Sequence, residues 1–223
     1  MPRDTLSRDQ IVRTAVEVLD AEGLEGMNMR ALGRRLNSAA TAVYWHVESK
    51  DNLVLLATDL VWGDLALPDP DTTGWRGAAT AMATDLYRMF TGHPWLVQVL
   101  AGHVVYGESR ARHDEHQLAV YEAAGFTGAV ADRAAAAVFT YVLGNAAAVA
   151  ATASLTRGLA PGGDGARERL AAAMTAAHEI AANHPRLRAR LETAAATGYT
   201  DATFEFGLNA LLDGLTRTTS RHQ

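Results

Sequence analysis

The stretch LNSAATAVYWHV, residues 36–47, predicts two short helices joined by a tight turn. Asn37 is one of the few residues other than glycine that tolerate a left-handed backbone, and Ser38 can cap the helix that follows. Upstream, residues 29–36 carry apolar side chains on one helical face, directly behind the N-cap residue Asn28. The sequence therefore predicts helix, tight turn and helix in succession.

Helices on both sides are expected to support this pair. Ser7 and Gln10 match a capping box and Gly23 offers a left-handed stop, which predicts a helix over residues 8–22. A further helix is expected over residues 49–65. Two short helices packed by a preceding one form the layout of a helix-turn-helix module, whose second helix lies in the major groove of DNA.

The rest of the chain predicts more helix and shows no alternating strand pattern. Gly, Pro and polar clusters separate helices expected at residues 75–91, 94–105, 109–124, 127–155, 165–182, 185–196 and 201–218. A surface loop is expected at residues 68–74. Apolar residues make up 48% of the chain and aromatic residues 7%, which favours helix over a β-rich fold. We therefore expect an all-α fold, with an N-terminal three-helix helix-turn-helix domain at residues 1–48 and a helical C-terminal domain at residues 49–223.

The second helix of the pair carries side chains that suit contact with DNA. Thr41, Tyr44, Trp45 and His46 bear hydroxyl, indole and imidazole groups that reach phosphates and base edges. Residues 28–50 hold four basic residues against one acidic residue, a local charge of +3 in a chain of net charge −5. The net charge argues against indiscriminate coating of nucleic acid, whereas the local excess is typical of a DNA contact.

These segments resemble the tetracycline-repressor-type (TetR) family of transcriptional regulators. The likeness is carried by residues 36–47, by SKDNL at 49–53, and upstream by IVRTAVEVL at 11–19 and MRALGRRL at 29–36. Asn37 is a departure, because the family usually has glycine there. The resemblance implies that bases or phosphates are contacted by Asn28, Arg30, Ala39, Ala40, Thr41, Tyr44, Trp45, His46 and Lys50.

The C-terminal part resembles the tetracycline repressor subgroup through residues 118–126 and FEFGL at 204–208. This resemblance implies that residues 49–223 form an effector-binding and dimerisation domain. Members of the family are all-α homodimers in which two late helices of each subunit form a four-helix interface, here residues 127–155 and 201–218. The implied dimer interface is the apolar stripe Phe204, Leu208, Leu211, Leu212 and Leu215. By helical spacing alone, this stripe is either buried inside one chain or lies at an oligomer interface.

Aromatic and imidazole side chains concentrate in the middle of the chain, as an apolar pocket with a few polar groups requires. Because the C-terminal domain of the resembled regulators houses an effector, at least two of these residues are expected to line a small-molecule site. The candidates are His93, Trp95, His103, Tyr106, Tyr121, Phe139 and Tyr141. No cofactor is expected.

Three other interpretations remain open. His113 and His116 have a spacing that can share a metal, so an all-α metal-dependent enzyme is an alternative, although no third ligand is identifiable. A helical adaptor without DNA binding is another. The uncharged run between Arg133 and Arg157 is long enough to span a membrane, but its alanine-rich composition favours a buried helix.

The chain is therefore expected to be a ligand-responsive transcriptional regulator, a homodimeric repressor that a small-molecule effector releases from a palindromic operator. It is not expected to be an enzyme, and no catalytic or metal-binding residue is assigned. The absence of cysteine and of an export signal favours a cytoplasmic location. The helix over residues 49–65 joins the two domains and is the expected lever between effector and DNA.

Overall fold

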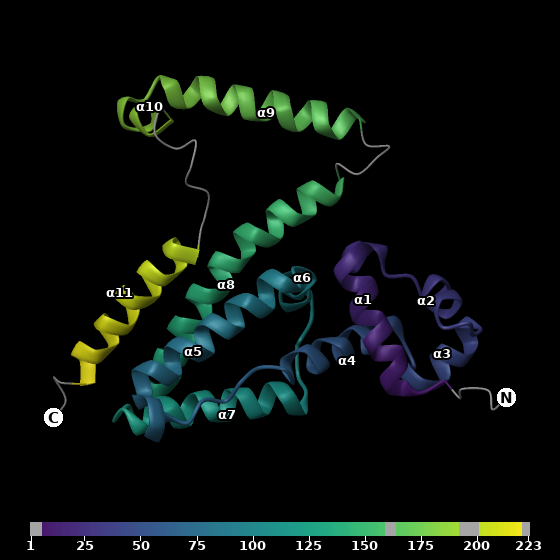
Figure 1. Ribbon diagram of the computed structural model, residues 1–223, viewed down its shortest axis with the longest axis horizontal. Coiled ribbons are helices and arrows are strands. Elements are labelled where there is room, and N and C mark those ends of the chain that lie inside the picture. Colours follow the sequence, from purple (N-terminus) through teal and green to yellow (C-terminus); the bar gives the residue numbers. More distant parts are fainter. Residues whose placement is uncertain (1–5, 159–163, 192–200, 220–223) are drawn as a thin grey trace. The chain divides into compact units, whose positions relative to one another are not determined.

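The structure, a computed structural model, describes residues 6–158, 164–191 and 201–219, and every regular element within these ranges is a helix (Figure 1). The helices are α1 (Arg8–Gly26), α2 (Met29–Arg35), α3 (Ala40–Val47), α4 (Lys50–Trp62), α5 (Pro70–Gly92), α6 (Trp95–Gly102), α7 (Glu108–Ala123), α8 (Ala129–Gly158), α9 (Asp164–Ala182), α10 (Pro185–Leu191) and α11 (Asp201–Thr219). The predicted all-α fold is confirmed, and most helix ends differ from the expected ones by a few residues. Residues 192–196 of the helix expected over 185–196 lie outside the described residues.

The chain divides into two compact units. The first combines residues 1–150 with 208–223, and the second comprises residues 151–207. The expected domain boundary after residue 48 falls inside the first unit, just before α4, and stays a prediction.

The first three helices enclose a small core of their own. Ile11 and Leu19 of α1, Leu32 of α2, and Val43 and Val47 of α3 are all fully buried. Burying an aliphatic side chain of this size stabilises the fold by about 1.5–3 kcal/mol. The α1–α3 bundle therefore has an apolar centre that fixes how its helices cross.

Side-chain caps fix where two of these helices begin. Ser7 Oγ accepts a hydrogen bond from the backbone N–H of Gln10 (3.1 Å), and Asn28 Oδ1 accepts one from the N–H of Arg30 (2.9 Å). Such a cap is worth about 1 kcal/mol. The chain leaves helical geometry at Gly23 (φ 73°) before α1 resumes for a last short turn. Both caps and the interruption agree with the sequence prediction.

The turn between α2 and α3 is tighter than the sequence suggests. Asn37 takes the expected left-handed backbone (φ 48°), and the N–H of Ser38 donates to the carbonyl of Gly33 at 2.8 Å. A Cβ on Gly33 would lie 2.9 Å from the carbonyl oxygen of Ser38 and 3.2 Å from the nitrogen of Ala40, so only glycine fits without displacing backbone. The prediction that Ser38 caps α3 is wrong: the N-cap is Ala39, which supplies no side-chain bond.

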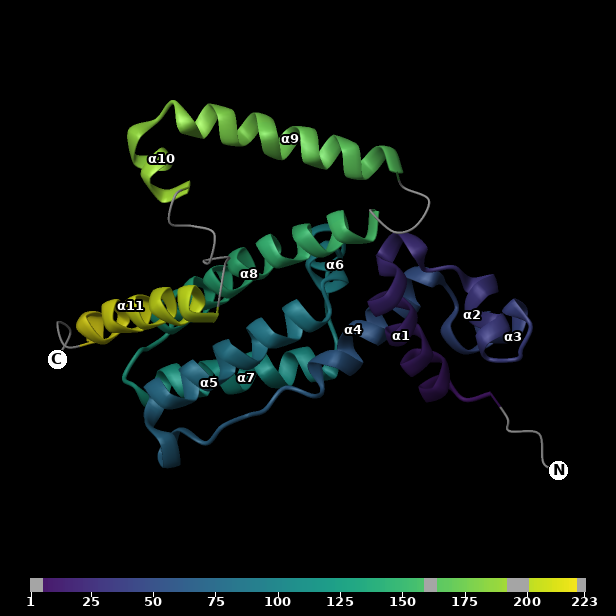
Figure 2. The same cartoon turned by 45° about the horizontal axis from the view of Figure 1, so that its top comes forward.

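Helices α5 and α7 of the first unit pack side by side (Figure 2). The expected loop at residues 68–74 is partly helical, because Asp69 Oδ1 accepts from the N–H of Asp71 (2.9 Å) and Pro70 suits a first helical turn. Gly74 (φ 71°) then interrupts α5 before its longer part begins.

Helix α7 ends in a Schellman motif, which the pair Gly125 and Phe126 favours. The N–H of Phe126 donates to the carbonyl of Tyr121 (3.2 Å), and the N–H of Gly125 donates to that of Glu122 (2.9 Å). The Phe126 ring folds back onto the Tyr121 ring, with 5.8 Å between their centroids. This contact sets the direction in which the chain enters α8.

Helix α8 buries one narrow face within the first unit. Val138, Val142 and Ala146, spaced four apart, are buried, whereas Gly144 on the opposite side is exposed. The part Ala129–Leu155 is long and apolar enough to cross a membrane, with a mean hydropathy of 1.6, and 28% of the window is buried. A core helix of a soluble protein has the same length and composition, so this observation is weak support for a membrane span.

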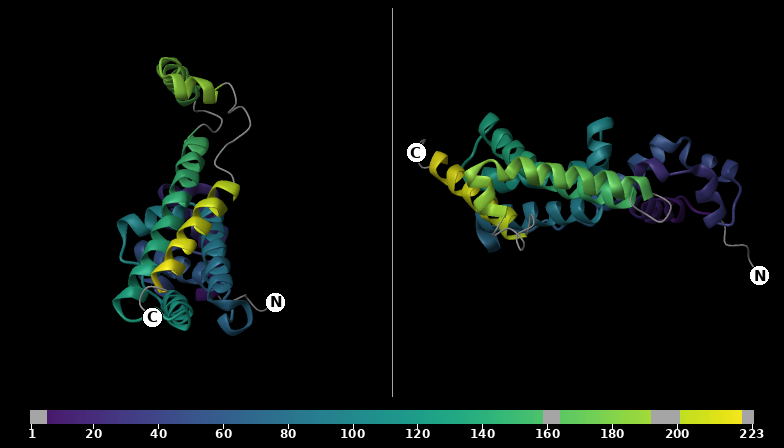
Figure 3. Two further views of the ribbon diagram at one scale, coloured as in Figure 1. Left: turned by 90° about the vertical axis from the view of Figure 1, so that its left-hand side faces the viewer. Right: turned by 90° about the horizontal axis from the view of Figure 1, so that it is seen from above.

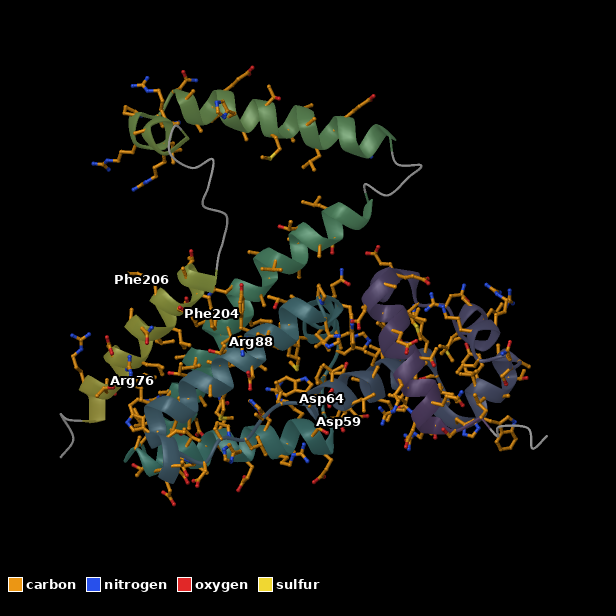
Figure 4. The ribbon with its side chains drawn as sticks, in the orientation of Figure 1. Asp59, Asp64, Arg76, Arg88, Phe204 and Phe206 are labelled. Atoms are coloured by element: carbon orange, nitrogen blue, oxygen red, sulfur yellow. The ribbon has the colours of Figure 1, made fainter. Side chains whose placement is uncertain are left out.

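The later part of α11 is attached to α5 within the first unit. The Arg76 guanidinium donates to Asp213 Oδ1 at 2.7 Å and to Asn209 Oδ1 at 3.3 Å (Figure 4). Leu208 and Leu212, on the facing side of α11, are buried. Packing within one chain therefore buries part of the apolar stripe of α11 that the family resemblance assigns to the dimer interface.

In the second unit, α9 runs into α10 through a tight turn (Figure 3). The N–H of Asn183 donates to the carbonyl of Ile180 (3.1 Å), and that of His184 donates to Ala181 (3.0 Å). The two helices contact each other, and Met174 and Leu187 remain exposed on them.

Candidate functional site

Helix α3 is divided into a buried side and a solvent side. Val43 and Val47 point into the core of the α1–α3 bundle, while Trp45 is 88% exposed and Tyr44 is 43% exposed. His46 is exposed as well. Exposing an indole costs the hydrophobic stabilisation that its burial would bring, so this arrangement does nothing for folding. The aromatic side chains of α3 are therefore available to a partner.

The other residues expected to contact DNA lie at the starts of α2, α3 and α4. Thr41 and Ala39 are exposed and Ala40 is half-buried at the start of α3, and Arg30 is exposed at the start of α2. Asn28 is exposed too, although its side-chain oxygen is occupied in capping α2. Of the nine residues, Ala40 and Lys50 are half-buried and the other seven are exposed, and their contacts with DNA stay a prediction.

The basic side chains near α3 differ in how they are held. Arg35 pairs with Glu22 at 3.1 Å in an exposed ion pair, so its charge is partly offset. Lys50, the first residue of α4, donates from Nζ to the carbonyl of Leu24 at 3.4 Å. An ammonium group held next to a helix N-terminus is suited to a phosphate, because the free backbone N–H groups attract the same anion.

A cavity of about 480 Å³ lies where α1, α4 and α7 meet. Charged side chains of both signs line it: Arg8, Asp9, Arg13, Asp59, Asp64 and Arg112. Asp59 Oδ1 accepts from the N–H groups of Ser109 (3.0 Å) and Arg110 (3.2 Å), so α4 supplies the cap at the start of α7. Figure 4 shows Asp59 near Asp64, which follows the end of α4. This link could not be predicted from the sequence, because no local pattern marks a cap that comes from another helix.

The seven residues expected to line an effector pocket are not brought together. His93 and Trp95 both bond to Asp20 of α1, Tyr121 packs against Trp75 and Phe126, and Phe139 packs against Phe90. Tyr106 is exposed, and His103 and Tyr141 are half-buried. Burial raises the pKa of the Tyr121 phenol, so that group stays protonated.

One of the seven, Phe139, lines a cavity between α7 and α8. The cavity measures about 300 Å³ and is lined by Arg110, Asp114, Gln117, Leu118, Asp132, Ala135, Ala136 and Phe139. Arg110, Asp114 and Gln117 share one face of α7, because they are spaced at four and three residues. Arg110 also lies over the rings of Trp62 (4.2 Å) and Phe139 (4.9 Å). Helical spacing could have identified the α7 face, but nothing local points to Trp62.

The histidine pair of the metal-enzyme alternative is split between two environments. His113 is buried against Trp62, with 5.1 Å between the ring centroids, whereas His116 Nε2 lies 2.9 Å from the carbonyl of Pro68. Among the residues that the structure describes, no group of three or more His, Asp or Glu side chains is arranged to hold a metal. The two imidazoles therefore do not form the start of a metal site.

The residues expected at a dimer interface fall into two groups. Phe204, Leu208 and Leu212 are buried within one chain, so they leave no apolar surface for a partner in this conformation. Leu211 and Leu215 are half-buried and remain available. Contact of these five residues with a partner subunit stays a prediction.

Both the N-terminal and the C-terminal part of the chain match known protein families. Residues 11–57 match the model for bacterial regulatory proteins of the tetR family, and residues 67–219 match the tetracyclin repressor-like C-terminal domain. An HTH-type transcriptional regulator of Saccharopolyspora erythraea is 38% identical over 143 residues, which is 64% of this chain and 61% of that protein. The HTH-type transcriptional repressor DrrR1 of Streptomyces coeruleorubidus is 34% identical over 146 residues, 65% of this chain and 54% of that protein. The match thus spans less than two thirds of either relative.

Among solved structures, the TetR family protein ActR of Streptomyces coelicolor in complex with actinorhodin has a TM-score of 0.74 to this chain. The two are 26% identical, and the match covers 96% of each chain. Apo ActR gives a TM-score of 0.75 at 24% identity, covering 99% of this chain and 100% of that one. The arrangement of helices is therefore similar to that of ActR.

Proposed function

Because the chain belongs to the TetR family of bacterial regulatory proteins, we propose that it is a ligand-responsive transcriptional repressor that binds a palindromic DNA operator as a homodimer. The observation that carries the proposal is the solvent side of α3, where Tyr44, Trp45 and His46 are exposed beside a local excess of basic residues. A recognition helix needs this combination of base-reading groups and positive charge.

The repressor role is supported by the relative DrrR1, whose name describes it as a transcriptional repressor. Release by a small molecule is supported by ActR, which has been solved with actinorhodin bound. An effector that favours one dimer shape over another lowers operator affinity by its differential affinity for the two shapes. In this chain α4 is the connecting element, since it follows α3 directly and caps α7 through Asp59.

The homodimer is supported by the uncovered side of α8. Thr140, Gly144 and Ala148 form an exposed row four residues apart, opposite the buried row of Val138, Val142 and Ala146. Small side chains let a second helix approach closely. With Leu211 and Leu215 of α11, this row would form each subunit's half of a four-helix interface, and the operator-binding dimer would act in the cytoplasm.

The test is selection of bound genomic DNA fragments with the purified chain, followed by affinity measurements on the recovered sequence. We expect an inverted repeat with half-site centres about 34–36 Å apart, one helical turn. The double variant Tyr44→Ala/His46→Ala should lose at least about 100-fold in operator affinity, while its melting temperature and its oligomeric state stay unchanged.

A matched control is Phe206→Ala, which also removes an exposed aromatic ring, one that is 79% exposed and lies outside α1–α4. This variant should bind the operator like the unmodified chain. Recovery of random fragments, or equal affinity losses for both variants, would contradict the proposal. Loss of the dimer in the Tyr44/His46 variant would assign those side chains a structural role instead.

A further inference from the structure

The junction between α3 and α4 contains a residue with an unfavourable backbone conformation. Glu48 alone separates Val47, the last residue of α3, from Ser49, the N-cap of α4. Its backbone angles are φ 62° and ψ −50°, and the N–H of Ser49 donates to the carbonyl of Val47 at 2.6 Å. These values describe a γ-turn with a positive φ, which is rare and strained. Glycine adopts such angles without strain, so the glutamate side chain is unfavourable at this position.

Contacts with both helices hold Glu48 in this conformation. The N–H of Glu48 donates to the carbonyl of Tyr44 at 2.7 Å, so the γ-turn follows directly on the helical bonds of α3. Asn52 Nδ2 donates to the carbonyl of Val47 at 3.1 Å, and the N–H of Asn52 donates to Ser49 Oγ at 3.0 Å. The Asn52 side chain therefore ties the end of α3 to the first turn of α4.

Both ends of the junction are also anchored in the α1–α3 bundle. Val47 and Leu53, on either side of the turn, are fully buried. Lys50 Nζ donates to the carbonyl of Leu24 in the last turns of α1 at 3.4 Å. Backbone strain persists where the surrounding structure fixes both sides, and it is most frequent at functional sites. Relief of the strain at Glu48 therefore requires the end of α3 or the start of α4 to move.

Such a movement would act first on the candidate DNA contacts. Tyr44, Trp45 and His46 lie in the last turn of α3, directly before the γ-turn, and all three are exposed. Contacts with base edges carry the sequence specificity of a DNA-binding protein, and they depend on hydrogen bonds with a narrow range of lengths and angles. The direction of α3 at this junction is therefore a determinant of how well these side chains reach the bases.

We propose that Glu48 and Asn52 are positioning residues for operator binding, because the strained turn at Glu48, held by the Asn52 side chain, fixes the direction of α3 against α4. The inference rests on the proposed function, since it concerns how the same surface is presented to DNA. A recognition helix that is fixed before binding loses less conformational freedom on the operator. The strain therefore lowers the stability of the chain and raises its operator affinity. Both residues act through the backbone of α3.

Two substitutions at Glu48 separate backbone strain from charge. Glu48→Ala and Glu48→Gly remove the same carboxylate, but only glycine adopts the positive φ without strain. We expect Glu48→Gly to melt about 2–4 °C above Glu48→Ala, the shift for relief of one strained residue in a chain of this size. Its affinity for the recovered operator should be at least about threefold lower, because a smaller fraction of the chains holds α3 in the binding direction. Thermal melting followed by circular dichroism and fluorescence anisotropy of labelled operator measure the two effects.

Asn52→Ala tests the bond between the two helices. Loss of the donor to Val47 should weaken operator binding about three- to tenfold. The slope of log affinity against log salt concentration should stay unchanged, because no phosphate contact is lost. Lys50→Ala, which removes a proposed phosphate contact, should instead reduce this slope by about 0.9. The matched control is Asn183→Ala, whose side chain also donates to a backbone carbonyl, that of Glu179 at 3.1 Å, and which should bind the operator like the unmodified chain.

Equal operator affinities of Glu48→Gly and Glu48→Ala, or a higher affinity of Glu48→Gly, would overturn the inference. A melting temperature of Glu48→Gly that does not exceed that of Glu48→Ala would do the same. A reduced salt slope of Asn52→Ala would place its side chain on a phosphate and contradict the positioning role. Where a Glu48 variant fails to fold, the affinity and salt slope of Asn52→Ala still decide.

Operator selection with the unmodified chain separates the two proposals. A chain that selects an operator, but whose two Glu48 variants bind it equally, contradicts only the inference. A chain that selects no operator contradicts the proposed function, and the positioning roles of Glu48 and Asn52 with it.

Discussion

Trp95 at the start of α6 donates its indole N–H to Oδ1 of Asp20 in α1, at 2.7 Å. The same oxygen lies 2.7 Å from His93 Nδ1, so one carboxylate of the α1–α3 bundle holds two side chains that precede or begin α6. Together with the Asp59 cap on α7, this bond ties the bundle to the helices beyond it. Each of these contacts depends on a single carboxylate. Removing that carboxylate would therefore break the polar contact between the bundle or α4 and the helices beyond.

Replacing Asp20 should destabilise the chain. Asp20→Ala leaves the buried Trp95 N–H without an acceptor, and we expect a loss of about 1–3 kcal/mol in the free energy of unfolding. Urea unfolding measures it. Asp85→Ala is the control, because it removes a carboxylate from an exposed pair with Arg88 (3.3 Å) and should cost no more than about 0.5 kcal/mol. Equal costs for the two variants would mean that the Asp20 bond adds little to stability.

Gly107→Ala should break the cap between α4 and α7. A Cβ at residue 107 would overlap the Asp59 carboxylate, which accepts from the first N–H groups of α7. We expect a cost of about 1–3 kcal/mol, similar to that of Asp59→Ala and not additive with it. Gly102→Ala, where a Cβ meets open space, should change stability by less than about 0.5 kcal/mol. Additive costs of Gly107→Ala and Asp59→Ala would show that they act separately.

Gly144→Arg should separate the dimer without unfolding the chain. The residue is exposed in one chain and a side chain there meets no neighbour, so the fold tolerates the substitution. A guanidinium in the proposed α8 interface would be buried without a partner, which costs more than a dimer contact can offset. Light scattering after size exclusion should report monomers, with unchanged helicity. Met174→Arg on α9 is the control, and a dimer that survives Gly144→Arg places the interface elsewhere.

The contribution of Asp114 should depend on pH. Burial acts to raise the pKa of Asp114, but its contacts with His113 and Arg110 outweigh burial, and the pKa lies below the ordinary value of 3.8. A lowered pKa in the folded state means that the carboxylate stabilises the fold above about pH 3.8 and that this stabilisation is lost as the pH falls through the folded pKa. Asp114→Asn should therefore melt below the unmodified chain at pH 7 and close to it at pH 2. A difference that is constant with pH would assign the effect to packing.

The local features of the fold were predictable because they depend on residues three to six apart. The caps at Ser7 and Asn28, the left-handed Asn37 and the end of α7 each follow from contacts within one turn of chain. The exposed side of α3 follows in the same way, since a period of 3.6 residues puts Val43 and Val47 together and leaves Trp45 opposite. The sequence alone thus identified both the fold class and the candidate DNA-binding surface.

The tertiary structure decided what distant residues do to one another. No sequence pattern pointed to Gly33, yet the close approach of the α2–α3 turn requires it. The spacing of His113 from His116 suggested a shared metal, whereas the fold packs His113 against Trp62 of α4. Of the α11 stripe, Leu208 and Leu212 are buried and Leu211 and Leu215 are half-buried, a division that packing inside the first unit decides. Periodicity shows which side of a helix is apolar, but what covers that side is determined by elements far away in the chain, and so only packing could settle it.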